Sequence, residues 1–290
     1  GNAGPWPADL HGGGEGKDLL YVDSIVAVDA NTGAYKWHYQ TVPGDEWDYD
    51  SVAHLMLADV VIKGQPRKVI MQANKNGFYY VIDRTNGKFI SGQPYASITW
   101  AKGLNEETGR PIINKESYYS EKESAIINPG PGGAHNWSPM SFNPQTGLVY
   151  IPSRGWDTFN YATDPEFKPD SSKVGGSSQT GLKSDTRNLP RQPAGPAIGP
   201  EPLEGGNVST LVAYDPVKQE VRWRKPVGNS RFGGTLSTAS NLVFQVAPSG
   251  SLMVWSADKG EQLLELPTGL VSGMGPPIRS EERRVGKECR

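Results

Sequence analysis

Asp48 and Asp50 stand two positions apart in the chain, beside Trp47 and Tyr49. If this stretch is extended, the two carboxylates project to the same side and can share one cation or one reacting group. A solvated loop explains the spacing equally well, because Asp and Gly residues such as those of the preceding segment 43–46 are typical of turns. The other motifs of the chain must decide between these interpretations.

Three further segments place polar groups among glycines and aromatic residues. They contribute an amide at Asn2, an ammonium group at Lys75, and an amide next to an indole ring at Asn136 and Trp137. Each segment could be an ordinary turn. Taken together with the two carboxylates, these groups form a suitable set for holding a flat polyanionic cofactor against a hard cation.

The composition excludes several classes of function. A formal charge of -2 leaves no basic footprint for nucleic acid, and the longest apolar stretches, such as 57–62, have the length of strands. No dinucleotide, phosphate-loop or nucleophile-elbow motif is present. The four histidines lie too far apart for a zinc motif that is local in sequence. With 36% hydrophobic residues, the chain can form one large all-β unit or two ordinary domains.

Both ends of the chain are unusual. It starts at Gly1 without an initiator Met, as a fragment would, and residues 279–290 resemble the translation of a sequencing adapter. We therefore assign residues 1–278 to the fold and treat 279–290 as an artefact. The only cysteine, Cys289, lies in that tail, so residues 1–278 offer no disulfide, thiol nucleophile or haem-attachment motif.

A turn motif recurs along the chain: an apolar run, then Asp or Asn, then Thr-Gly or a substitute, and often Trp. The copies are centred on Asp29, Asp83, Asn143, Asp215 and Asp258, which are 54, 60, 72 and 43 residues apart. Such periods fit four-stranded propeller blades with insertions, and a β-sandwich with similar turns is the alternative. The long segments 92–131 and 154–207 are expected to be insertions that lie over one face and cover a site.

These motifs resemble the second half of a pyrroloquinoline-quinone (PQQ)-dependent alcohol dehydrogenase of the methanol/ethanol family. The repeats, with Trp37 and Trp223, look like the tryptophan-docking motifs that join the blades in that family. The resemblance covers essentially all of residues 1–278. It implies an all-β fold, a partial eight-bladed β-propeller with long loop insertions.

The resemblance also implies a role for each polar group. Asn2 is similar to a metal ligand, Asp48 to the catalytic base, and Lys75 to the residue that contacts the quinone. Asn136 and Trp137 resemble a cofactor-contacting segment. The implied reaction is oxidation of a primary alcohol to an aldehyde in the periplasm, with cytochrome c as electron acceptor. A homodimer is one option for the full-length form.

Asp50 refines the expected metal. In the family that this chain resembles, calcium enzymes carry a small or uncharged residue two places after the catalytic Asp, whereas lanthanide enzymes carry a second Asp. A trivalent hard cation favours more anionic oxygen than a divalent one. We therefore predict that Asp48, Asp50 and Asn2 bind a lanthanide ion, with calcium as the alternative. Segments 42–45 and 134–140 look more like ethanol-type than methanol-type enzymes.

Two other functions remain open from the sequence. Related repeats also build non-catalytic propeller scaffolds of the cell envelope, which have no need of Asp48, Asp50 and Lys75 in these contexts. A glycoside hydrolase would pair Asp48 with Glu46 or Asp50 across a sugar bond. Further site residues of the resembled family lie upstream of Gly1 in its members, so the chain alone is expected to bind the cofactor weakly and to be inactive.

Overall fold

The computed structural model describes residues 7, 16–168, 180–183, 185–192, 195–204, 209–228, 233–247, 249–269 and 277. The adapter-like tail 279–290 lies outside the described residues. Within the described part of the chain, nearly all regular structure is β, and one short 3-10 helix, η1, spans Lys115–Ser117. The all-β expectation is therefore confirmed.

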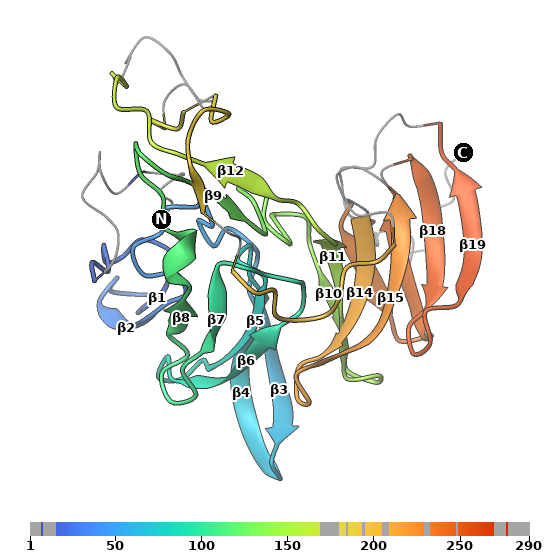
Figure 1. The fold of residues 1–290 in the computed structure, drawn as a ribbon. Helices are drawn as coiled ribbons and strands as arrows, with labels where there is room; N and C mark the ends of the chain where they lie inside the picture. The colour runs from blue at the N-terminus through green and yellow to red at the C-terminus, as the bar shows by residue number, and fades with distance from the viewer. Residues whose placement is uncertain are drawn as a thin grey trace.

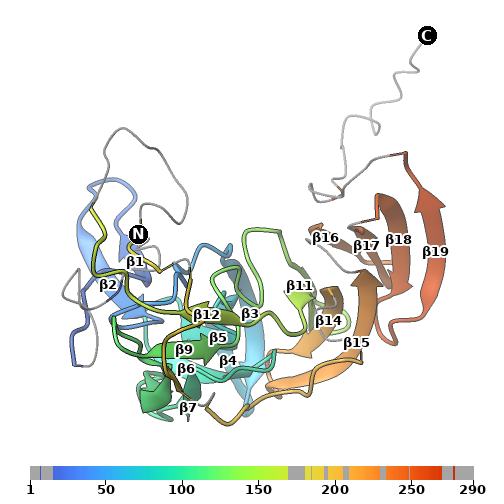
Figure 2. The ribbon, with the colours of Figure 1, turned by 45° about the horizontal axis from the view of Figure 1, so that its top comes forward.

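Three four-stranded antiparallel sheets follow one another in an arc (Figures 1 and 2). The first is β3 (Met56–Ile62), β4 (Gln65–Ala73), β5 (Phe78–Asp83) and β6 (Phe89–Pro94). The second is β10 (Ser141–Asn143), β11 (Leu148–Arg154), β14 (Ser209–Asp215) and β15 (Glu220–Gly228). The third is β16 (Thr235–Thr238), β17 (Leu242–Val246), β18 (Ser251–Ser256) and β19 (Gln262–Pro267). The pair β1 (Ser24–Val28) and β2 (Tyr35–Gln40) precedes them, so the order is that of successive propeller blades.

The two long segments expected to be insertions contain sheets of their own. Strands β7 (Ala101–Leu104) and β8 (Pro111–Ile113) form a hairpin. Strand β9 (Ser124–Ile127) lies between β12 (Phe159–Tyr161) and β13 (Arg191–Gln192). The β7–β8 turn is a further copy of the repeated motif, since the Asn105 side chain accepts hydrogen bonds from the backbone N–H groups of Glu107 and Thr108.

The irregular spacing of the repeat has a structural cause. The turns at Asp83, Asp215 and Asp258 join the third and fourth strands of their sheets, whereas the turn at Asn143 joins the first and second strands. Both kinds of turn use the same chemistry, because a side-chain oxygen accepts a backbone N–H two residues later, at 2.8 Å for Asp83 and 2.9 Å for Asn143. The motif therefore marks tight hairpins rather than one fixed place in each blade.

Tryptophans join neighbouring sheets at these turns. Trp223 of β15 packs against Gly260 in the β18–β19 turn and donates a hydrogen bond of 3.2 Å from Nε1 to the Ala257 carbonyl oxygen. Trp37 of β2 packs in the same way against Gly87 in the β5–β6 turn. A side chain at either glycine would overlap the indole ring, so the glycine and the tryptophan require each other.

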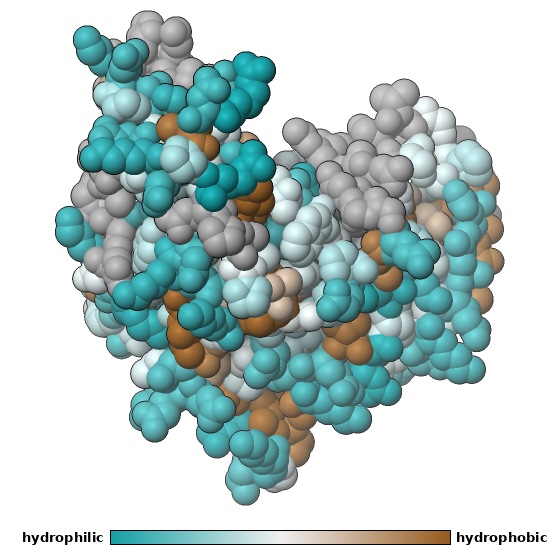
Figure 3. Space-filling view, viewed as in Figure 1, coloured by the Kyte–Doolittle hydropathy of each residue, from teal (hydrophilic) through white to brown (hydrophobic). Residues whose placement is uncertain are grey.

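The apolar cores lie between sheets. One buried cluster joins β3–β5 to β11 and β14, where Tyr79 and Tyr214 pack with ring centroids 4.5 Å apart. Another joins β11 and β14 to β17 and β18. Apolar side chains are exposed along β19, where Leu263, Leu264 and Leu266 are each about half exposed, on the edge that appears brown in Figure 3.

Gly260→Ala is predicted to destabilise the chain more than Gly33→Ala. Both glycines have a positive φ, +66° and +70°, so both substitutions share the cost of that conformation. Only at Gly260 would the new Cβ lie 2.7 Å from Trp223, whereas nothing lies within 4 Å at Gly33. Because of this overpacking, Gly260→Ala is expected to lower the free energy of unfolding by about 1–3 kcal/mol more than Gly33→Ala does. Urea denaturation measures both values. Equal losses for the two variants would contradict tryptophan docking.

Candidate functional site

The two carboxylates of the sequence motif meet the ammonium group of Lys75. Lys75 Nζ lies 3.4 Å from Asp48 Oδ2 and 3.0 Å from Asp50 Oδ1. The Lys75 side chain is 3% exposed, against 23% for Asp48, which forms the solvent side of the cluster. The structure therefore brings together three of the predicted site residues.

The segment that carries the carboxylates is not the extended strand that would place them on one side. Asp48, Asp50 and Ser51 have φ values of +64°, +36° and +47°, so the chain winds tightly here. The buried carboxylate of Asp45 organises this winding, since Oδ1 accepts the N–H of Trp47 at 2.9 Å and Oδ2 accepts that of Tyr49 at 2.8 Å. The expected convergence of Asp48 and Asp50 is found, but a loop produces it.

Lys75 occupies the tip of the β4–β5 hairpin, where hydrogen bonds fix the backbone. Asn74 Oδ1 accepts the N–H of Asn76 at 3.0 Å, and Asn76 Oδ1 accepts the N–H of Phe78 at 2.9 Å. Gly77 completes the turn with a φ of +93°, and a Cβ there would overlap Ile98. The hairpin thus holds a cation on a buried, rigid element.

A buried polar network ties the loop to this hairpin. Asn74 Nδ2 donates to Ser51 Oγ at 2.9 Å, and Ser51 Oγ lies 2.5 Å from Thr41 Oγ1. Gln72 Nε2 donates to the Ala53 carbonyl oxygen at 2.7 Å. Because these bonds lie on both sides of the carboxylates, the loop has little freedom to move relative to Lys75.

Buried aromatic side chains pack under the backbone of the loop and fix its position. Trp47 and Tyr49 are fully buried and contact Trp100, with ring centroids 5.5 and 5.2 Å from it. Their polar atoms are also fixed, since Trp47 Nε1 donates to the Ser117 carbonyl oxygen at 3.0 Å. Tyr161 donates from its hydroxyl to the Trp47 carbonyl oxygen at 2.9 Å. The residues that flank Asp48 are therefore anchors of the loop, and Asp48 is the one left partly exposed.

Burial raises the pKa values of three acidic groups in or near this cluster, Asp48, Asp45 and Asp23. The pKa of Asp48 is raised to about 6, chiefly by burial, although the nearby Lys75 charge acts in the opposite direction. Burial also raises the pKa of Asp45 to about 6 against the effect of its backbone hydrogen bonds. Asp23, which is fully buried beside Asp45, has a pKa well above its ordinary value because of burial and the Asp45 charge. Burial therefore favours the neutral form of Asp23, and Asp48 is largely ionised at neutral pH.

The segment containing Asn136 and Trp137 runs along the Lys75 turn. The N–H of Ala134 donates to the Lys75 carbonyl oxygen at 2.9 Å, and Gly133 packs directly against the Lys75 side chain. The Asn136 amide donates to the Gly132 carbonyl oxygen at 3.1 Å, within its own loop. Trp137 is 62% exposed. Both residues lie on the loop next to Lys75, and the hydrogen bonds described for the Asn136 side chain stay within that loop.

Buried His135 fastens this segment to the hairpin. Its Nδ1 lies 2.8 Å from the Ala73 carbonyl oxygen, and its Nε2 lies 2.7 Å from that of Ser138. Burial lowers the pKa of His135 to about 4, so the ring is neutral at pH 7 and one nitrogen donates. His135 is therefore a buried packing and hydrogen-bonding residue.

The donor set in the described residues fits part of a cation site. Asp48 and Asp50 supply hard carboxylate oxygens at one place, and Asp50 Oδ1 is buried without an aligned hydrogen bond. Asn2, the third predicted ligand, lies outside the described residues. Among the residues that the structure describes, no cluster of three or more His, Cys, Asp or Glu side chains could hold a metal. Lys75 has three N–H groups, so it retains a donor for a quinone oxygen beside its two carboxylates.

Sequence reasoning missed Asp45 and Asp23 as members of the site. A signal existed for Asp45, because an Asp that follows Gly in a turn-forming segment commonly accepts the N–H two residues later. No local signal marked Asp23, whose proximity to Asp45 is a long-range consequence of the fold.

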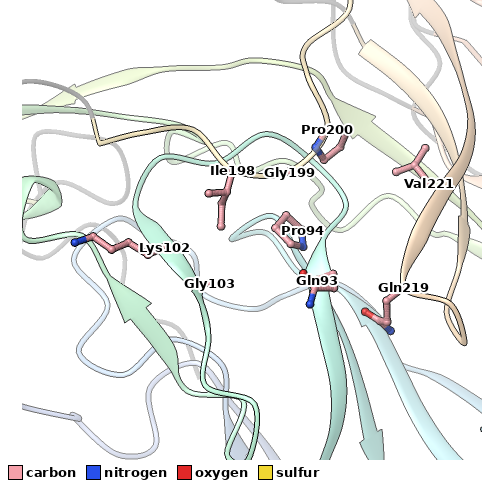
Figure 4. Close-up of a pocket in the computed structure, with 9 residues that line it drawn as sticks. All are labelled: Gln93, Pro94, Lys102, Gly103, Ile198, Gly199, Pro200, Gln219 and Val221. Atoms are coloured by element: carbon pink, nitrogen blue, oxygen red, sulfur yellow. The ribbon is translucent and has the colours of Figure 1, made fainter. Parts of the chain in front are cut away.

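Two hollows of about 420 and 680 Å³ lie elsewhere, and their linings include neither Asp48 nor Lys75. The smaller one, shown in Figure 4, lies between β6, β7, the segment 195–204 and the hairpin of β15, with Gln93, Ile198 and Gln219 in its wall. The larger hollow has charged residues of its own in its lining, Glu106 and Glu220 with Lys63 and Lys218, and it is separate from the Asp48 cluster. In the described part of the chain, no helix is long and apolar enough to cross a membrane.

Comparison with known proteins places this chain in a family. Residues 4–99 and 93–269 match the model of the PQQ glucose/ethanol/alcohol dehydrogenase β-propeller domain. A quinohemoprotein alcohol dehydrogenase of Comamonas testosteroni is 44% identical over 270 residues, which are 93% of this chain and 36% of the relative. A 1-butanol dehydrogenase (cytochrome c) of Thauera butanivorans is 40% identical over 264 residues, 88% of this chain and 35% of the relative.

Solved structures agree with the sequence matches. The crystal structure of the Comamonas enzyme superposes with a TM-score of 0.78 at 42% identity, over 94% of this chain and 39% of that one. A europium-containing methanol dehydrogenase gives a TM-score of 0.75 at 27% identity, over 94% and 44% of the two chains. The chain thus spans a little over a third of the length of the curated relatives it matches. With its successive blades and docked tryptophans, it belongs to the PQQ-dependent glucose/ethanol/alcohol dehydrogenase β-propeller family.

Proposed function

We propose that this chain forms part of a periplasmic quinoprotein that oxidises primary alcohols to aldehydes. Residues 1–278 are the propeller part, and 279–290 do not belong to it. The observation that carries the proposal is the meeting of Asp48 and Asp50 at the buried Lys75 ammonium group. A scaffold gains nothing from this cluster, because burying charges costs several kcal/mol of desolvation per ion in proteins.

Asp48 is the base in this proposal. PQQ, when bound, supplies an electrophilic carbonyl that can accept a hydride equivalent from the alcohol carbon. Asp48 is ionised at neutral pH and is the most exposed group of the cluster, so its carboxylate is placed to accept the hydroxyl proton. Lys75 donates a charge-assisted hydrogen bond toward the quinone oxygens and neutralises charge that develops there.

The proposed metal ligands are Asn2, Asp48 and Asp50. The cation supplies Lewis-acid polarisation of the quinone carbonyl when it is bound. Asp50 adds a second carboxylate next to Asp48, which favours a lanthanide over calcium because a trivalent cation gains more from added negative charge. We further propose cytochrome c as electron acceptor, Asn136 and Trp137 as cofactor contacts, and a homodimer as a possible form of the full-length enzyme.

Asp48→Asn is expected to lower alcohol turnover by roughly 100- to 10,000-fold, since the amide cannot take a proton. The test uses a chimera in which this chain replaces the matching segment of the Comamonas testosteroni relative, loaded with PQQ and metal. Alcohol-dependent dye reduction measures turnover, and circular dichroism and PQQ content confirm that the site has assembled. An assembled chimera that reduces no dye, or an Asp48→Asn variant that retains activity, would sink the proposal.

The metal preference is tested in the same chimera after removal of bound ions. Reconstitution with La³⁺ is expected to give more activity than Ca²⁺, and Asp50→Ala is expected to reverse this order by removing one anionic ligand. Asp59→Ala is the matched control, because Asp59 is an exposed carboxylate on β3 that pairs with Arg84. Higher activity with Ca²⁺ in the parent chimera, or full La³⁺ activity after Asp50→Ala, would contradict the assignment.

A further inference from the structure

The loop that carries Asp48 and Asp50 is held in an unfavourable backbone conformation. Three of its residues, Asp48, Asp50 and Ser51, have positive φ values. For residues other than glycine, this region is sterically unfavourable, although Asp tolerates it better than most. Some other interaction must therefore stabilise this backbone conformation, so that the two carboxylates face Lys75.

Asp45 supplies that interaction. Its carboxylate is 1% exposed and lies within the curve of the loop, where it accepts backbone N–H groups from Trp47 at 2.9 Å and Tyr49 at 2.8 Å. The N–H of Asp50 points to the same Oδ2 at 3.4 Å. These donors flank Asp48 on both sides, and consecutive N–H groups that converge on an anion form a concavity suited to a carboxylate.

We propose that Asp45 is a positioning residue that sets the separation and direction of the Asp48 and Asp50 carboxylates. It touches neither the substrate nor the metal, and it acts through the backbone N–H groups on either side of Asp48. This inference rests on the proposed function for the meaning of the carboxylate pair, but the hydrogen bonds themselves do not depend on it.

Asp45 differs from the turn-forming Asp residues of the blades in what its turn carries. Asp215 also accepts two backbone N–H groups, from Val217 at 3.1 Å and Lys218 at 2.9 Å, but its turn holds no carboxylate pair and lies outside the cluster. The comparison separates a general loss of turn stability from a loss of site geometry. Asp215→Asn is therefore the matched control for Asp45→Asn.

The isosteric change Asp45→Asn replaces one acceptor oxygen by an N–H donor that faces the loop amides. In the full chain, hydrogen exchange at the amides of Trp47 and Tyr49 is expected to speed up at least tenfold, while exchange in β4 and β5 stays unchanged. Asp215→Asn is expected to leave exchange at Trp47 and Tyr49 unchanged and to keep its own turn, because Asp215 accepts both N–H groups with Oδ1 alone and the Asn105 amide oxygen accepts the corresponding pair of N–H groups in its turn. Unchanged protection of the Trp47 and Tyr49 amides in Asp45→Asn would overturn the proposal.

Binding of Tb³⁺, followed by luminescence excited through the buried Trp47 ring, gives the second readout. Asp45→Asn is expected to weaken Tb³⁺ binding at least tenfold, and Asp215→Asn is expected to leave it unchanged. Equal affinity for the parent chain and Asp45→Asn would overturn the positioning role. If the parent chain and Asp50→Ala bind Tb³⁺ equally or not at all, the proposed metal site fails, and hydrogen exchange still decides the role of Asp45. Should Asp45→Asn not fold, Asp45→Ser is measured in the same way.

Discussion

The site depends on one electrostatic constraint, a nearly fully buried ammonium group that needs carboxylates beside it. Lys75 stands on a hairpin that hydrogen bonds hold rigid, so its charge cannot move to water. Removing one partner of a buried ion pair costs about 3–5 kcal/mol in proteins. The ion pairs with Lys75 therefore stabilise the packing of the loop that carries Asp48 and Asp50 against the hairpin. The polar network through Ser51 and Asn74 and the aromatic residues under Trp47 support that closure.

Negative charge nevertheless outweighs positive charge at this place. Asp48 and Asp50 face a single ammonium group, and burial raises the pKa values of Asp48 and of nearby Asp45 against the effect of their charged or hydrogen-bonding partners. Burial and the Asp45 charge raise the pKa of Asp23 well above its ordinary value, which favours its neutral form and limits the excess. A second cation would relieve more of it, and this is the physical basis on which the proposed metal site stands.

The sequence predicted the fold well because the repeat encodes local chemistry. An Asp or Asn that binds its own turn, a glycine with positive φ and a tryptophan at the following strand are all readable in the chain, and Trp223 on Gly260 confirms the docking. It predicted the meeting of Asp48, Asp50 and Lys75 from family resemblance, although the loop conformation differs from the extended stretch that spacing suggested. Asp23 was beyond reach, because its neighbour Asp45 lies 22 positions away and only the folded chain brings the two carboxyl groups together. Asn2 lies outside the described residues, so its role stays a prediction.

The direction of tryptophan docking carries a consequence for cooperativity. Each docked ring reaches forward to a turn of the sheet that follows it, from β2 to the β5–β6 turn and from β15 to the β18–β19 turn. Coupling of this kind is between nearest neighbours, as in a one-dimensional array of repeats. A substitution that destabilises one blade therefore destabilises the neighbouring blades most, and its effect decreases with each further interface between blades. The loop that carries Asp48 and Asp50 lies between β2 and β3, at such an interface. Its conformation therefore depends more strongly on the docking of Trp37 than on that of Trp223.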